Sequence, residues 1–175
     1  TPAPSPPSTP KQLPFAKQLQ ISTKSLPKIK KRSSDVIGKL DSGATHHYTR
    51  SCDANSLRNK IPTLNGPSVQ LPNKTFLSSS REGNLNFPAG LSKFGTHAYE
   101  FPGITNSTLV SVGQLCDDDC VVVFDKEIAL ILKNGHVLLT GERNPDDGLW
   151  DIHIPNISHH SANAVIRSDK TKSDL

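Results

Sequence analysis

Asp41, Ser42 and Gly43 form the one group of residues in this chain whose types and spacing could carry out a reaction. They follow the apolar run Val36-Ile-Gly-Lys-Leu40, which predicts a strand that delivers a carboxylate to a tight turn. Such a carboxylate can activate water for peptide hydrolysis when a second carboxyl group lies close enough to share one proton. Like charges at that distance do not both ionise, so one group acts as base and the other as acid.

The chain supplies this motif once. A second candidate, Asp146-Asp147-Gly148, lacks the hydroxyl residue in its middle position. The second carboxylate must therefore come from another copy, which predicts an obligate homodimer with one Asp41 from each subunit at a two-fold axis. Ser42 could hydrogen bond across to the partner loop, and Gly43 allows close backbone approach. A short motif also arises by chance, and its alternative interpretation is an ordinary Asx turn.

Charge divides the chain into two parts. Half of the fourteen prolines precede residue 35, together with seven Lys/Arg and no Asp or Glu, whereas the remaining residues carry thirteen basic and sixteen acidic side chains. This composition predicts a disordered basic linker over residues 1–34. The run Lys28-Ile-Lys-Lys-Arg32 could make weak non-specific RNA contacts, although the solvated linker is the preferred interpretation.

Other classes of protein are disfavoured. No apolar stretch is long enough to cross a bilayer, and the start does not resemble a secretory signal, so we expect no membrane partner and no secretion. The absence of methionine suggests a piece of something longer. Cys52, Cys116 and Cys120 are an odd number, which favours reduced thiols, and they offer at most half a zinc site. We expect neither a metal nor a cofactor.

The elements that must position Asp41 are mainly strands. Apolar and polar residues alternate over 68–71, 84–87 and 150–154, and Asn134-Gly135 predicts a hairpin between the runs 128–133 and 136–139. Residues 121–124 are expected to pair with the first of those runs, and one short helix is expected over 111–116. The prediction is an all-β domain over 35–155, a small β-barrel or pair of orthogonal sheets, followed by a loose polar tail over 156–175.

The stretch Leu40-Asp-Ser-Gly-Ala-Thr-His-His-Tyr-Thr49 resembles the protease signature of copia-type retrotransposon polyproteins. Three later stretches, residues 69–73, 101–117 and 141–150, resemble the same family in the same order. The resemblance implies a retropepsin-like β-barrel that cleaves its own polyprotein inside a cytoplasmic particle. It implies that Asp41 is catalytic and that Ser42, Gly43 and Thr45 support the active-site loop.

The same resemblance assigns further segments. Leu109-Val110-Ser111 and the helix after them would support the active-site loop, and a substrate-covering flap would fall near residues 66–80. Residues 156–175 would lead toward a pre-integrase region. His159 and His160 in that tail have no evident metal-binding partners in the chain.

Lys39 departs from the family pattern, because an apolar side chain is usual two residues before the catalytic aspartate. Its charge could depress the pKa of a nearby carboxylate. The alternative hypothesis is therefore an inactive structural remnant of a decayed retroelement, a folded β-domain that spaces its neighbours without cutting them. A phosphorylation-dependent recognition peptide fits poorly, since His46 stands where a second serine would be needed.

Overall fold

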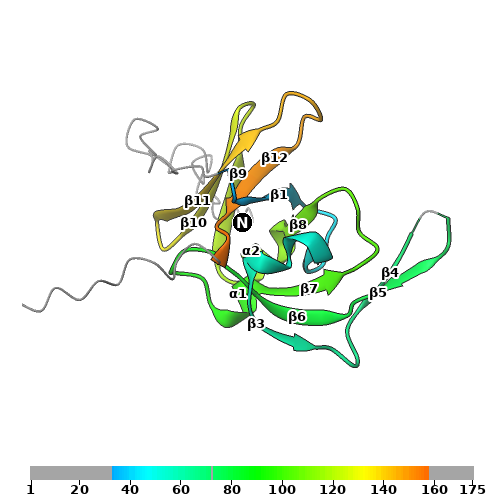
Figure 1. Ribbon diagram of the computed structural model, residues 1–175. Helices are drawn as coiled ribbons and strands as arrows, with labels where there is room; N and C mark the ends of the chain where they lie inside the picture. The colour runs from blue at the N-terminus through cyan, green and yellow to red at the C-terminus, as the bar shows by residue number, and fades with distance from the viewer. Residues whose placement is uncertain (1–32, 72, 158–175) are drawn as a thin grey trace, which may run out of the picture.

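A computed structural model describes residues 33–71 and 73–157, and most of them lie in strands (Figure 1). The strands are β1 (Val36–Asp41), β2 (His47–Arg50), β3 (Leu57–Pro62), β4 (Ser68–Gln70), β5 (Phe76–Ser78), β6 (Arg81–Leu85), β7 (His97–Phe101), β8 (Thr108–Ser111), β9 (Cys120–Phe124), β10 (Ile128–Lys133), β11 (His136–Arg143) and β12 (Trp150–Ile154). The helices are a 3-10 helix, η3 (Ser51–Ser56), and the short α1 (Lys93–Thr96) and α2 (Val112–Asp117). The prediction of an all-β domain with a short helix after residue 111 is confirmed.

Ten strands form one sheet in the order β3-β6-β7-β2-β8-β1-β12-β11-β10-β9, and β4 and β5 form a separate hairpin. The sheet is not closed, because its end strands β3 and β9 do not pair, so the predicted barrel is wrong. Irregularity in β3 explains this result. Its register shifts between Arg58 and Ile61, Asn59 has a φ of 53°, and Pro62 has no N–H to donate. Such an edge is a poor template for another strand.

The predicted hairpin at Asn134-Gly135 is confirmed. These residues have φ angles of 52° and 76°, and β10 and β11 pair on either side of them from Lys133 and His136 onward. Strand β9 pairs with β10, also as predicted. The sequence did not predict α1 or η3, because helices of four and six residues are too short for an apolar period to show.

The centre of the sheet has an unusual order. Strands β1 and β2 are consecutive in the chain but are not neighbours, because β8 lies between them, parallel to β1 and antiparallel to β2. Strand β2 is in turn parallel to β7. The loop of residues 42–46, which joins β1 to β2, must therefore cross the end of β8. This loop contains most of the predicted catalytic motif.

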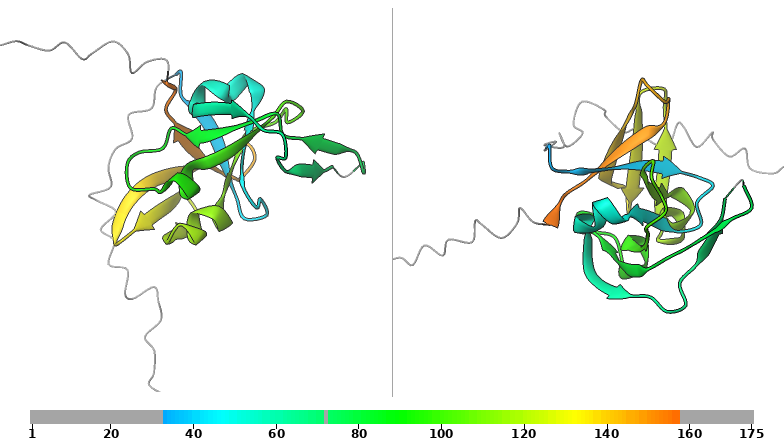
Figure 2. Two further views of the ribbon diagram at one scale, coloured as in Figure 1. Left: turned by 90° about the horizontal axis from the view of Figure 1, so that it is seen from below. Right: turned by 45° about the vertical axis from the view of Figure 1, so that its right-hand side comes forward.

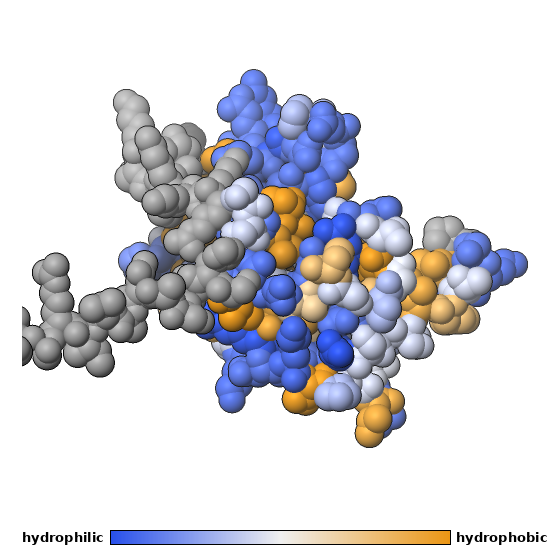
Figure 3. Space-filling view, in the orientation of Figure 1, coloured by the Kyte–Doolittle hydropathy of each residue, from blue (hydrophilic) through white to orange (hydrophobic). Residues whose placement is uncertain are grey.

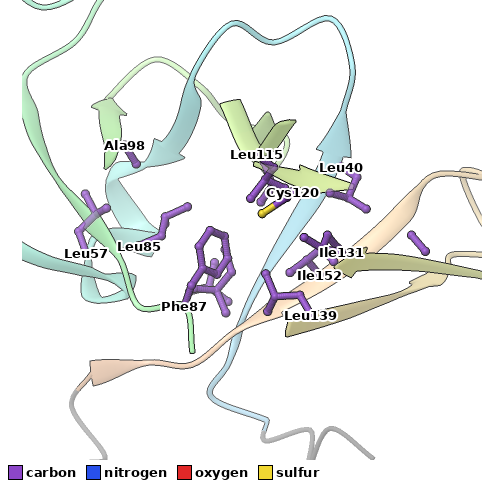
Figure 4. Packing of buried hydrophobic residues seen from close by; sticks show 14 residues of the cluster. Leu40, Leu57, Leu85, Phe87, Ala98, Leu115, Cys120, Ile131, Leu139 and Ile152 are labelled. Carbon is purple, nitrogen blue, oxygen red and sulfur yellow. The ribbon is translucent and has the colours of Figure 1, made fainter. Parts of the chain in front are cut away.

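The main core lies inside the curve of the sheet. Side chains from the β3-β6-β7 side and from the β10-β11-β12 side converge there, and Leu115 and Cys120 approach from α2 and β9 (Figure 4). A second buried cluster consists of Ala44, Tyr48 and Phe101 with partly buried residues around them. The β4–β5 hairpin projects away from the body beside this second cluster (Figures 1 and 2).

Residues 1–32 and 158–175 lie outside the described residues. They contain almost all of the predicted linker and tail, including the basic run 28–32 and the two tail histidines. Among the residues that the structure describes, no helix is long and apolar enough to cross a membrane.

Ile152 offers a test of the core. It pairs with Gly38 on one side and Gly141 on the other, is fully buried, and occupies the space that Gly141 leaves. Ile152→Ala should lower the free energy of unfolding by about 2–5 kcal/mol, because it removes buried apolar surface and leaves a cavity. The control is Phe76→Ala on the exposed hairpin, for which we expect a change within about 0.5 kcal/mol. Chemical denaturation of both variants at equal concentration measures the difference, and similar losses would contradict this account of the core.

Candidate active site

Asp41 is the last residue of β1 and lies at the surface end of the strand, half-buried. Its Oδ1 accepts a hydrogen bond of 2.7 Å from the backbone N–H of Gly43, which fixes the carboxylate against its own turn. The other oxygen, Oδ2, has no hydrogen-bonding partner within residues 33–71 and 73–157. One oxygen is therefore held, and the other is available for water or for a second carboxyl group.

Gly43 is in close contact with this carboxylate. A Cβ atom at residue 43 would lie 3.3 Å from Asp41 Oδ1, closer than ordinary van der Waals contact. Ser42 and Gly43 are both exposed, and the Ser42 hydroxyl has no partner among the described residues. Ser42 therefore faces outward, where a second subunit could approach.

Thr45 supports the loop from the outer side. Its Oγ1 lies 2.8 Å from the Tyr48 hydroxyl and 3.1 Å from Nδ1 of His46. The Tyr48 ring packs edge-on against Phe101 with 5.0 Å between the ring centroids. Thr45 thereby connects the loop to the second buried cluster.

Ser111, the last residue of β8, holds the loop from beneath. Its Oγ donates a 2.6 Å hydrogen bond to the Ala44 carbonyl oxygen and accepts one of 3.0 Å from the backbone N–H of Gln114, so the same hydroxyl also caps α2. Ser111 is fully buried. Sequence resemblance assigned this residue and the helix after it to loop support, and the structure places both directly under the predicted catalytic motif.

His47 and Gln114 complete the support, and neither of them was predicted to have this role. The backbone N–H of Ser111 donates to His47 Nδ1 at 2.8 Å, and His47 Nε2 donates to the Gly95 carbonyl at 3.0 Å. Gln114 Oε1 accepts from the His47 N–H at 2.8 Å, and Gln114 Nε2 donates to two carbonyls beside α1. Alternation along a strand puts His46 and His47 on opposite faces, so the sequence does indicate that one histidine points inward, without indicating what it binds.

The chemistry of its partners fixes the tautomer of His47. Ser111 N–H can only donate and Gly95 O can only accept, so the neutral ring carries its proton on Nε2. Burial lowers the pKa of His47 to about 4, against the weaker opposing effect of the hydrogen bond to Gly95, and the charges of His46 and His97 lower it further. The ring is therefore neutral wherever the pH is well above 4.

Lys39 does not leave an uncompensated charge near the motif. Its ammonium nitrogen lies 2.6 Å from Asp147 Oδ2 and 2.5 Å from Asp151 Oδ1. Burial disfavours the charge of Lys39, but the hydrogen bonds and charges of the two carboxylates outweigh burial and raise its pKa. Lys39 in turn is the main cause that lowers the pKa of Asp147. The carboxylate whose pKa Lys39 lowers is thus Asp147, a residue of the β11–β12 turn.

The face of the sheet that carries Asp41 is distinct from the face that carries the main core. Residues paired across neighbouring strands share a face, and register places Lys39 beside Leu109, Leu109 beside Tyr48, and Tyr48 beside Tyr99. The residues between them, such as Leu40 and Val110, point into the main core. Asp41 lies two residues beyond Lys39 in the same strand and so belongs to the same face.

The β4–β5 hairpin stands over one end of this face. Val69 from β4 and Leu77 from β5 pack against the cluster of Ala44, Tyr48 and Phe101, and Gly103 leaves room for Leu77. Phe76 next to Leu77 is 65% exposed. Hydrophobic side chains gather where the hairpin leaves the body (Figure 3). The segment 66–80, predicted to be a flap, is therefore a projecting hairpin beside the loop of residues 42–46.

Within the part of the chain that the structure describes, no three His, Cys, Asp or Glu side chains come together as they would around a metal ion. Cys52 and Cys116 are exposed and Cys120 is buried, and all three are free thiols. Comparisons of the chain with models of protein families, with characterised proteins and with solved structures found no match.

Removal of the Lys39 charge tests the assignment of its ion pairs. In Lys39→Met, the pKa of Asp147 should rise toward the ordinary value for aspartate, about 3.9, because its main stabilising partner is gone. NMR titration of the side-chain carboxyl carbons measures this change. An unchanged Asp147 titration would show that Lys39 is held elsewhere in solution.

Proposed function

We propose that the chain is an aspartic endopeptidase of the retropepsin-like class, working as a homodimer in which each subunit contributes Asp41. The observation that carries the proposal is the position of Asp41, on an exposed turn with one carboxylate oxygen held by Gly43 and the other without a partner among the described residues. A second Asp41 brought to the same point by a two-fold axis would form a pair of carboxyl groups that shares one proton. Water between them would then be activated by one carboxylate while the other acts as acid.

The surrounding surface fits an extended peptide substrate. Leu109 on the face that carries Asp41 is partly exposed, and the β4–β5 hairpin stands beside it with Val69 and Leu77 packed at its base against the buried Tyr48. A peptide that lies across this face would pass between the Asp41 turn and the hairpin. The hairpin would act as the flap that excludes water from the bound peptide.

Resemblance of four ordered segments to copia-type polyproteins supports a more particular proposal. The substrate would be the retrotransposon polyprotein from which the chain derives, and cleavage would take place in a cytoplasmic particle. The alternative is an inactive structural remnant, a hypothesis for which Lys39 was one of the reasons. The ion pairs of Lys39 with Asp147 and Asp151 weaken that reason, because the charge is compensated away from Asp41.

Asp41→Asn provides the direct test. The purified chain should cleave peptides that span its own residues 1–34 and 156–175 at mildly acidic pH, where the carboxyl pair holds one proton. Asp41→Asn should abolish the cleavage, since an amide can neither accept the proton from water nor share one. Mass spectrometry of the products measures it. The matched control is Asp117→Asn, which changes an exposed aspartate at the end of α2. This variant should cleave the peptides like the wild type.

Equal cleavage by the Asp41→Asn variant would remove this residue from the mechanism. Sedimentation supplies an independent check, because a single carboxylate cannot run the reaction alone. A strict monomer at high concentration would contradict the proposal even if some cleavage were seen.

Gly43→Ala should reduce activity without preventing folding. The added Cβ would lie 3.3 Å from Asp41 Oδ1 and must displace the carboxylate by a few tenths of an ångström. Displacements of about 1 Å can lower rates by about 100-fold, so we expect a decrease in kcat of about 10-fold or more. The control is Gly113→Ala in α2, where a Cβ would have ordinary contacts. Wild-type kcat in Gly43→Ala would show that the carboxylate has room to spare.

A further inference from the structure

We propose that His47 is a positioning residue of the catalytic loop and that it holds the loop only while its imidazole ring is neutral. This inference rests on the proposed function. His47 is completely buried in β2 and lies edge-on to Phe87, with 5.7 Å between the ring centroids. It touches neither Asp41 nor the surface where a peptide would bind, so it acts through the residues that it binds.

The connection from His47 to the loop has two steps. The ring nitrogen Nδ1 accepts the backbone N–H of Ser111, and the Ser111 hydroxyl donates to the carbonyl of Ala44, three residues after Asp41. The same hydroxyl caps α2 at Gln114, whose side chain returns to the backbone N–H of His47. The result is a closed set of buried hydrogen bonds that fixes the end of β8, the start of α2 and the loop together.

Protonation would break this set at one point. The imidazolium ion carries a proton on both nitrogens, so Nδ1–H would face the Ser111 N–H, and two donors would oppose each other in a buried site. The bond from Nε2 to the Gly95 carbonyl would survive. Ser111 would then have to move, and the Ala44 carbonyl would move with it.

The charged groups around His47 do not offset this cost. His46, the last residue of the loop, and His97 in β7 both disfavour a positive ring. The Glu82 carboxylate lies 3.8 Å from Nε2 of His97. The Asp118 carboxylate, beside Gly95, accepts from the Ser92 N–H and pairs with Lys133. Among the described residues no carboxylate hydrogen bonds to the His47 ring. Burial holds the pKa at about 4, so the loop should loosen as the pH falls through that value.

Two substitutions separate the role of the neutral ring from bulk packing. His47→Gln keeps an acceptor and a donor but does not titrate, so kcat should stay within about 10-fold of wild type and the acid limb of the kcat profile should move to lower pH. His47→Leu lacks the acceptor, so kcat should fall about 10- to 100-fold at every pH with little change in KM. His136→Gln, which removes an exposed histidine at the start of β11 that is not near His47, is the control and should keep the wild-type profile.

The inference is overturned if His47→Gln and the wild type have the same acid limb in their kcat profiles, since the carboxyl pair alone would then determine that limb. It is also overturned if His47→Leu keeps the kcat of the wild type. Absence of any Asp41-dependent cleavage in the wild type is a different result and would count against the proposed function. The two failures are therefore distinguishable.

NMR supplies a test that needs neither activity nor a folded His47 variant. In the Asp41→Asn protein, the ring nitrogens of His47 and the backbone amides of Ala44 and Ser111 are followed from pH 7 to pH 3. We expect all three to shift with one midpoint near pH 4. A His47 pKa near the ordinary value of about 6.5, or amides that do not follow the ring, would overturn the inference.

Discussion

The hydrogen bond from the Ser111 hydroxyl to the Ala44 carbonyl is the interaction on which the candidate site depends. Strand β8 lies between β1 and β2, so the loop that joins those strands has to cross over its end. A crossing loop leaves its backbone groups without strand partners, and buried groups of that kind are costly unless they are bonded. Ser111 satisfies one of them while it caps α2. The turn that carries Asp41 is thus fixed by the order of the strands, and not only by its own residues.

The effect of the Lys39 charge depends on residues that are far from it in the sequence. Alone, a lysine two residues before Asp41 indicates a disturbed carboxylate. The register of β1 with β12 places Asp151 directly beside it, and the β11–β12 turn adds Asp147. Its positive charge then links β1 to that turn, and a single buried lysine organises three segments of the chain.

The sequence was informative wherever a local pattern decides the structure. Asn134-Gly135 determines a turn through its positive φ angles, and alternation identifies β12, because both depend on neighbouring residues only. Sheet closure was predicted wrongly, since it depends on whether two edges far apart in the chain can pair. The supporting roles of His47 and Gln114 were not predicted for a related reason. Their partners lie 64 and 67 residues away, and nothing in the local sequence indicates which groups these buried side chains bind.

The β4–β5 hairpin has a consequence of a different kind. In the part of the chain that the structure describes, it is a two-stranded sheet that pairs with no other strand, and such a unit has little stability of its own in water. Its base is packed, but Phe76 near its outer part is exposed, so its strands should open long before the main sheet does. An opened, extended segment with an exposed aromatic side chain is a good peptide substrate. If the chain is the protease proposed for it, autolysis should begin in this hairpin, and the lifetime of the active dimer would be set by how long a bound peptide keeps the hairpin closed.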